Sequence, residues 1–174
     1  LVRWSVDGSE IVPNVAKSWQ ISDDATTYTF QLRKGMKWSD GEEFTADDIV
    51  FWWTYVESNK DIQSKPRGYM VVKGEQATVK DVDKHTVQFS WSNPNGLLLV
   101  NLASPYGVRV VQFAEHYHRQ FIKGLNPDGV AKLMAADGST DYTQWWNATV
   151  GSYGKQSEYN NPARPSVHGW IPKE

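Results

Sequence analysis

Hydrophobic and polar residues alternate along several stretches of the chain, and this spacing is typical of strands that bury one face. In the first half the alternation stops at the polar turn 22–24 and resumes in residues 27–32. It returns in residues 77–81 and 87–91, on either side of the short polar segment 83–84. The pattern therefore predicts two β-hairpins, each with one apolar face.

A helix is predicted over residues 46–57, where apolar residues become nearly continuous. Thr45 can cap its first turn, and Asp48, three residues later, is the reciprocal partner expected in a capping box. Because the segment is apolar almost all round, we expect it to be buried on most sides. Further helices are predicted over residues 114–121, 127–136 and 141–150. For the short apolar run 97–102, periodicity leaves a helix and an extended strand both open, and we favour the helix.

Strands followed by helices favour an α+β fold: an antiparallel sheet with a buried helix packed on it and a mostly helical carboxyl-terminal third. The length of 174 residues suits one domain over residues 1–174, of which residues 123–174 read as a helical insert and tail. The chain starts at Leu1 inside an alternating pattern and ends at Glu174 after a proline-punctuated stretch. We therefore expect it to be cut from a longer protein.

Charge and composition exclude several function classes. Lys and Arg number 18 against 20 Asp and Glu, so the formal net charge of -2 provides no electrostatic footprint for nucleic acid or an anionic membrane. The absence of cysteine excludes disulfides, thiolate catalysis and Cys-ligated metal sites. No apolar run approaches the roughly 20 residues that cross a bilayer.

The motifs of catalysis and of cofactor binding are missing from the sequence. There is no Gly-x-Ser-x-Gly nucleophile elbow and no glycine-rich phosphate loop. His116 and His118 invite a metal interpretation, but their spacing points them to different faces of a helix. We therefore expect no catalytic residues, no metal site, no cofactor and no enzyme activity. A hydrolase with an unrecognised carboxylate pair is a weaker alternative.

Aromatic residues are unusually frequent, with nine Trp, eight Tyr and six Phe. Such side chains either fill a core or form a stacking surface for a ligand. The four tryptophans on predicted helices are expected in the core: Trp52, Trp53, Trp145 and Trp146. The alternative is an autonomous carbohydrate-binding module that stacks sugars on exposed Trp and Tyr rings. Buried tryptophans would favour the core interpretation, and solvent-facing tryptophans would favour the binding module.

Three segments carry a resemblance to a known family: residues 11–19, 23–41 and 44–51. They include the runs Tyr-Thr-Phe-Gln-Leu-Arg-Lys-Gly-Met-Lys-Trp-Ser-Asp-Gly and Phe-Thr-Ala-Asp-Asp-Ile-Val-Phe. In register, they closely resemble the signature of family 5 extracellular solute-binding proteins, the oligopeptide-, dipeptide- and nickel-binding proteins of ABC importers. Residues 79–89 resemble the next hairpin of that family, and the resemblance fades beyond about Gln120.

The resemblance implies a two-lobed clamp that closes on a solute and presents it to a membrane permease. This chain would be part of the amino-terminal lobe, an extra subdomain with its flanks, and would depend on the remainder of the polypeptide for much of its ligand contact. The solute implied is a peptide, an oligosaccharide or a similar small molecule. The location implied is periplasmic or extracellular. Whether a membrane anchor precedes Leu1 is left open.

Position in the family pattern selects three candidate ligand-binding residues. Tyr69 lies in the loop after the buried helix, and Tyr106 and Arg109 lie in the loop after the apolar run 97–102. Aromatic faces can stack on a peptide or a sugar, and a guanidinium can pair with a carboxylate. In the alternative interpretation, both tyrosines pack on the edge of the domain and Arg109 is a solvated charge.

Overall fold

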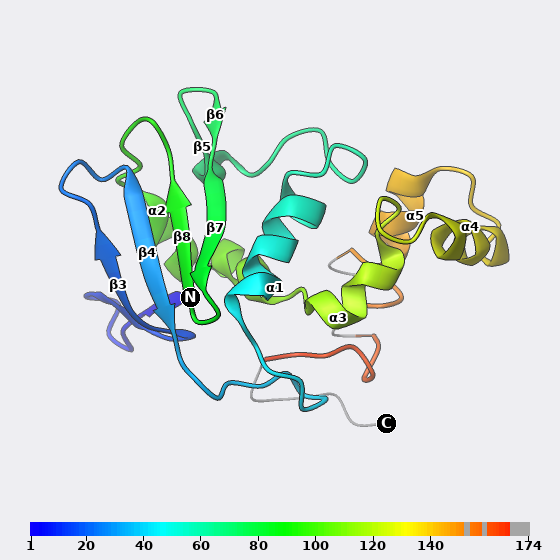
Figure 1. Ribbon diagram of the computed structural model, residues 1–174, viewed down its shortest axis with the longest axis horizontal. Coiled ribbons are helices and arrows are strands. Elements are labelled where there is room, and N and C mark those ends of the chain that lie inside the picture. The colour runs from blue at the N-terminus through cyan, green and yellow to red at the C-terminus, as the bar shows by residue number, and fades with distance from the viewer. Residues whose placement is uncertain (152–153, 158–159, 168–174) are drawn as a thin grey trace.

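An antiparallel sheet of four strands, in the order β3-β4-β8-β7, forms one side of the molecule (Figure 1). In this computed structural model, residues 1–151, 154–157 and 160–167 are described. The strands are β3 (Ala16–Ile21), β4 (Thr27–Leu32), β7 (Thr78–Asp83) and β8 (Thr86–Ser90). Both predicted hairpins are confirmed, and β4 and β8 pair at the centre of the sheet.

Most of the alternating apolar residues of these strands lie on one buried face, although Ile21 on the edge strand β3 is 43% exposed. Tyr28 pairs with Phe89 and Phe30 with Val87 across β4 and β8, and Val79 pairs with Phe89 across β7 and β8. The rings of Phe30 and Phe89 meet edge to face, with centroids 5.7 Å apart. Because side chains alternate across a strand, the threonines and glutamines between them lie on the opposite face.

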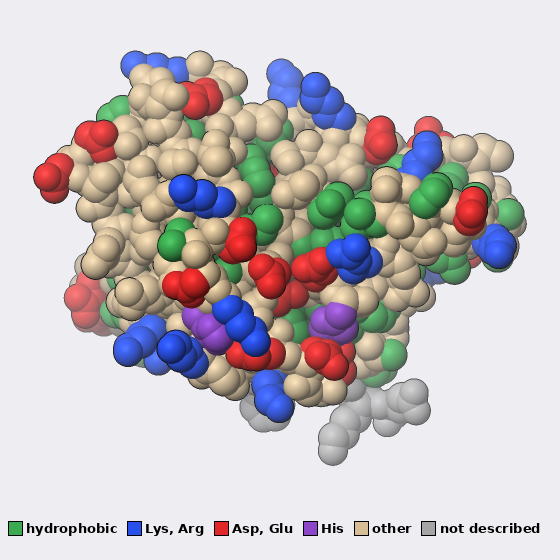
Figure 2. Space-filling view, viewed as in Figure 1, with side chains coloured by type: hydrophobic (Ala, Val, Ile, Leu, Met, Phe, Trp, Pro, Cys, Tyr) green, Lys and Arg blue, Asp and Glu red, His purple; other side chains and the backbone are tan. Residues whose placement is uncertain are grey.

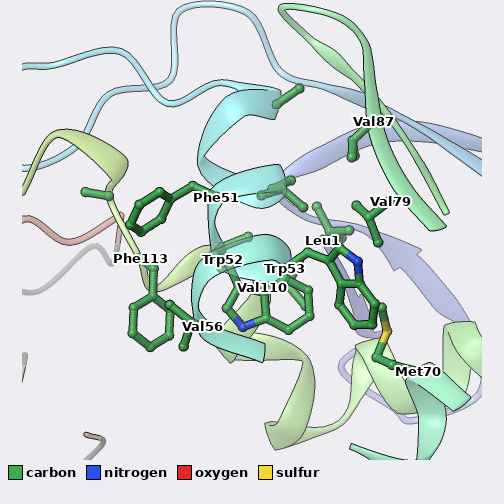
Figure 3. Close-up of a cluster of buried hydrophobic side chains, with 14 of the residues drawn as sticks. Leu1, Phe51, Trp52, Trp53, Val56, Met70, Val79, Val87, Val110 and Phe113 are labelled. Atoms are coloured by element: carbon green, nitrogen blue, oxygen red, sulfur yellow. The ribbon is translucent and has the colours of Figure 1, made fainter. Parts of the chain in front are cut away.

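Helix α1 (Ala46–Phe51) begins at the predicted capping box, with Thr45 at its N-cap and the Asp48 carboxylate accepting the Thr45 backbone N–H at 3.0 Å. It continues into the π-helix η1 (Trp52–Glu57), so the helix over residues 46–57 is confirmed, although its wider second half was not predicted. Both Trp52 and Trp53 are buried there. Figure 3 shows Phe51 and Val56 pointing toward Phe113, while Val79 and Val87 of the sheet lie on another side of the helix.

Helix α2 (Leu98–Ala103) confirms the helical interpretation of the apolar run, and the 3₁₀-helix η3 (Pro105–Val111) follows it directly. The two helices approach so closely that a Cβ atom at Gly107 would lie 1.9 Å from the Leu102 carbonyl oxygen. Only glycine fits at that position. Strands β1 (Val2–Trp4) and β2 (Ile11–Pro13) form a separate hairpin that packs against α2.

Three short elements lie along the chain between the end of η1 and the start of β7. They are the 3₁₀-helix η2 (Gly68–Met70) and the paired strands β5 (Val71–Val72) and β6 (Glu75–Gln76). The sequence pattern did not predict them, because two- and three-residue elements have no measurable periodicity. They place Tyr69 in a helical turn rather than in an irregular loop.

The carboxyl-terminal third is helical, as predicted, and lies on the side of α1 away from the sheet (Figure 1). Its elements are α3 (Glu115–His118), the 3₁₀-helix η4 (Arg119–Phe121), α4 (Pro127–Ala136) and α5 (Tyr142–Thr149). The part of the predicted tail beyond residue 167 lies outside the described residues. None of the helices in the described ranges combines the length and the apolarity that crossing a membrane requires.

Candidate functional site

The candidate site lies where η1, η2 and η3 meet, at the end of the buried helix. Tyr69 comes from η2, Tyr106 and Arg109 come from η3, and Glu57 is the last residue of η1. Because a 3₁₀-helix has three residues per turn, Tyr106 and Arg109 lie one above the other on the same side of η3. Both loops that were expected to carry the site are therefore short helices with defined side-chain directions.

Glu57 is a fully buried carboxylate that holds the segment leading to Tyr69. Its Oε1 accepts the Arg67 backbone N–H at 2.7 Å, and its Oε2 pairs with Arg67 Nη1 at 2.6 Å. A charge in such surroundings is tolerated because an opposite charge and a further hydrogen bond compensate its lost hydration. This pair fixes the start of η2 against the end of η1.

Tyr69 and Arg109 share this low-dielectric environment with the ion pair. Burial, followed by the charge of Glu57, raises the pKa of Tyr69 to about 12. Burial, followed by the charge of Arg67, lowers the pKa of Arg109 to about 10, and Tyr69 and Glu57 act on it in the opposite direction. Tyr69 and Arg109 also act on each other's pKa, so the structure brings these two side chains near one another.

The two side chains differ in how they are held. The hydroxyl of Tyr69 is enclosed and has no hydrogen-bond partner among the described residues, and the residue as a whole is half-buried against the core. The guanidinium of Arg109 lies over the ring of Phe113, with 5.4 Å between its Cζ and the ring centroid. Arg109 is half-buried, so the alternative of a fully solvated charge is wrong.

Tyr106 is the exposed member of the set, with 63% of its surface accessible. Its neighbours Pro105 and Gly107 line a cavity of about 450 Å³ between η3 and the first strand. The Tyr106 side chain makes no hydrogen bond and no ring contact with the residues that the structure describes. The ring is therefore presented to solvent beside a hollow, on the same side of η3 as Arg109.

The histidines that suggested a metal site are separated by the fold. His116 Nε2 lies 2.8 Å from Asp40 Oδ2 on the surface, whereas His118 is fully buried. Figure 2 shows acidic side chains gathered in the middle of one face with histidines beside them. Within the described ranges, however, no three His, Cys, Asp or Glu side chains are grouped as metal ligands.

Most tryptophans of the described chain are in the core. All four that were assigned there from the sequence are buried, and so are Trp38 and Trp91. Trp4 is 39% exposed and Trp19 is half-buried. A sugar-stacking module needs a strip of solvent-facing rings, so this distribution does not support the alternative of an autonomous carbohydrate-binding module.

Two residues of the site were missed at the sequence level. Glu57 is a charged residue at the end of a helix predicted to be buried, and such a residue needs a partner. That signal was present in the sequence. Arg67, its partner, lies ten residues away across a polar loop, and nothing in the pattern selects it over neighbouring cations.

The chain matches known proteins over most of its length. Residues 10–154 match the family model described as bacterial extracellular solute-binding proteins, family 5 Middle. The match therefore extends beyond Gln120, where the resemblance in the sequence alone fades.

Two relatives of known sequence are a peptide-binding and a sugar-binding protein by name. The chain is 35% identical to the dipeptide-binding protein of Escherichia coli K12 over 119 residues, which are 61% of this chain and 22% of that protein. It is 35% identical over 91 residues to the periplasmic alpha-galactoside-binding protein of Rhizobium meliloti, covering 52% of this chain and 13% of the relative.

Solved structures with similar folds lead to the same family. The oligopeptide-binding protein OppA superposes with a TM-score of 0.82 at 32% identity, over 98% of this chain and 25% of that one. The periplasmic binding protein MelB of Agrobacterium fabrum C58, in complex with stachyose, gives a TM-score of 0.63 at 26% identity, over 94% and 21% of the two chains. This chain thus spans a quarter or less of the length of these relatives. The breadth of the family-model match establishes that the chain belongs to family 5 of the bacterial extracellular solute-binding proteins.

Proposed function

We propose that this chain is part of the solute-binding component of an ABC importer, which captures a peptide, an oligosaccharide or a similar solute outside the cytoplasm. The protein delivers that solute to a membrane permease and catalyses no reaction. The observation that carries the proposal is the family match over residues 10–154, reinforced by a fold shared with an oligopeptide-binding protein over 98% of the chain.

The chain contributes one part of a larger binding protein, in this proposal the extra subdomain of the amino-terminal lobe with its flanks. Its relatives are several times longer, because 61% of this chain matches 22% of the dipeptide-binding protein and 98% of it matches 25% of OppA. The remainder of the polypeptide supplies the other lobe and much of the solute contact. Closure of two lobes about a hinge then encloses the solute.

Tyr69, Tyr106 and Arg109 are the proposed solute contacts of this part. Tyr106 offers an exposed ring for stacking, and Tyr69 is a half-buried residue whose hydroxyl is enclosed in the cluster. Arg109 lies on the same side of η3 as Tyr106 and can pair with a carboxylate group of a peptide. Tyr69 sits on a short helix whose start is anchored by a buried ion pair, which suits a preorganised site.

The proposal is tested with the complete protein that contains this sequence. Trialanine and stachyose are added in a thermal-shift assay, because a molecule that binds only the folded state raises the melting temperature. Tyr69→Leu is expected to weaken binding of the stabilising probe about tenfold, since an aromatic contact is worth about 0.5–1.5 kcal/mol. Tyr69→Phe keeps the ring and is expected to bind within about twofold of wild type, because the enclosed hydroxyl does not reach the solute.

Tyr142→Phe is the matched control, because Tyr142 lies in the helical third and its hydroxyl bonds to the Phe121 carbonyl at 3.0 Å. This control is expected to lose about 1–2 kcal/mol of stability with no change in affinity. Tyr69→Phe is expected to match or exceed wild-type stability, because it removes an unpaired buried hydroxyl. Wild-type affinity in Tyr69→Leu would exclude Tyr69 from the solute contacts, and a failure of peptides and sugars alike to bind would count against the proposed solute classes.

A further inference from the structure

The segment that carries Tyr69 is attached to three different parts of the molecule. Arg67 is held by Glu57 of η1 through its backbone N–H and its guanidinium. The Tyr69 carbonyl oxygen accepts a hydrogen bond from Asn95 Nδ2 at 2.9 Å. One residue further, the Met70 carbonyl oxygen accepts from Trp91 Nε1 at 3.2 Å. The helix, the turn after β8 and the end of β8 thus each hold one residue of this segment.

The backbone of Asn95 is itself fixed to the first hairpin of the sheet, as is that of Trp91, whose N–H donates to the Thr26 carbonyl at 3.0 Å. The Asn95 N–H donates to the Ala25 carbonyl at 2.9 Å, and the Asn95 carbonyl accepts from the Tyr28 hydroxyl at 2.6 Å. The residue is 6% exposed, in the turn that follows β8. Its short side chain therefore connects the sheet to the backbone of Tyr69.

We infer that Asn95 is a positioning residue for solute binding, which acts by holding the backbone of Tyr69. The inference rests on the proposed function, in which the Tyr69 ring contacts solute. A three-residue 3₁₀-helix has few internal hydrogen bonds, so its orientation depends on external anchors. Without the Asn95 bond, solute binding has to order this turn, and the cost of that ordering lowers the affinity.

The chemistry of the anchor requires an amide at this position. The Tyr69 carbonyl is an acceptor, so its partner must donate, and Asn presents an NH₂ group on a short side chain. Leucine has a similar size and no donor. Glutamine retains the amide on a longer side chain, and serine retains a hydroxyl donor at smaller volume.

The test compares Asn95→Leu with Asn95→Gln and with Tyr28→Phe in the complete protein. Tyr28→Phe removes the bond to the Asn95 carbonyl while the Asn95 amide remains in place. Two quantities are measured: hydrogen exchange of the backbone amides of residues 67–70, and affinity for trialanine or stachyose, whichever raises the melting temperature. Asn95→Leu is expected to speed that exchange about tenfold and to weaken binding about five- to tenfold.

Asn95→Gln is expected to recover part of both effects, and Tyr28→Phe is expected to lower the melting temperature while affinity stays within about twofold of wild type. Unchanged exchange in Asn95→Leu, or faster exchange with wild-type affinity, would overturn the positioning role. Should Asn95→Leu fail to fold, Asn95→Ala, which also removes the donor, is compared with Tyr28→Phe by the same two criteria. Failure of the proposed function is recognised separately, because Tyr69→Leu would then also bind like wild type.

Discussion

His118 is a fully buried imidazole on α3, enclosed by aromatic rings. Ring centroids of Phe113 and Tyr117 each lie 5.0 Å from its own. His118 Nδ1 lies 2.8 Å from the Ala114 carbonyl oxygen and therefore donates to it, whereas Nε2 has no hydrogen-bond partner among the described residues. Burial, followed by the nearby charge of Arg164, lowers the pKa of His118 well below its usual value. The folded protein holds this side chain neutral.

The stability of the protein is consequently expected to fall in mild acid. The unfolded chain takes up a proton at His118 below pH about 6.5 and the folded chain does not, so stability falls by up to about 1.4 kcal/mol per pH unit below that value. Denaturant unfolding between pH 7.5 and 5 measures this slope. His118→Phe, which suits the aromatic enclosure, is expected to flatten the profile. Identical profiles in the two proteins would contradict this assignment.

At the scale of elements, one carboxylate joins the start of α1 to two other segments. Asp48 Oδ2 accepts from the Thr45 backbone N–H and from Trp38 Nε1 at 3.2 Å, and Oδ1 accepts the Glu115 backbone N–H at 2.8 Å. Burial raises the pKa of Asp48, while these three hydrogen bonds act in the opposite direction. The helix cap is thus also the connection between the loop before α1 and the beginning of α3.

Removing that carboxylate is expected to cost much more than removing the cap hydroxyl. Asp48→Ala leaves three donors without their acceptor and should lower the free energy of unfolding by about 2–4 kcal/mol. Thr45→Ala should cost about 1 kcal/mol, the usual value of an N-cap. Asp47→Ala, an exposed neighbour in the same turn, is the control and should cost less than about 0.5 kcal/mol. Equal losses at Thr45 and Asp48 would show that Asp48 acts only as a cap.

At the scale of the whole molecule, the last described segment is fastened to the interior by Arg164, which is 4% exposed. Its Nη2 donates to the Gln112 carbonyl at 3.0 Å, and its Nη1 lies 3.2 Å from the Gln156 carbonyl and 3.4 Å from that of Val150. The guanidinium also lies over Phe113, 5.3 Å from the ring centroid. One side chain thus connects the end of η3, the end of α5 and the segment that follows α5.

Arg164→Lys is expected to loosen α5 without affecting the sheet. An ammonium cannot reproduce the planar fork, so carbonyls lose their donors and stability falls by about 2 kcal/mol. Amide exchange in α5 should accelerate at least about tenfold, while exchange in β4 and β8 stays as in wild type. Lys155→Met, which removes an exposed pair with Asp137, is the control and should change stability by less than about 0.5 kcal/mol. If amide exchange accelerated equally in α5, β4 and β8, the helix and the sheet would instead unfold as one cooperative unit.

The sequence by itself determined the elements that depend on neighbours along the chain. Alternation placed β4 and β8, the Thr45 and Asp48 pair placed the start of α1, and the helix favoured for the apolar run 97–102 became α2. These signals are readable because hydrogen bonds and side-chain periodicity within a helix or a hairpin are local. The family resemblance likewise depended on short segments in register.

Only the tertiary structure decided how the candidate site is assembled. Glu57 and Arg67 meet across a loop, and Asn95 reaches Tyr69 from 26 residues further along the chain. The sequence could not select these partners, because many polar residues have the same chemistry and only packing brings a particular pair together. The physical reason is that burial fixes which donors and acceptors must be satisfied, and burial is a property of the whole fold.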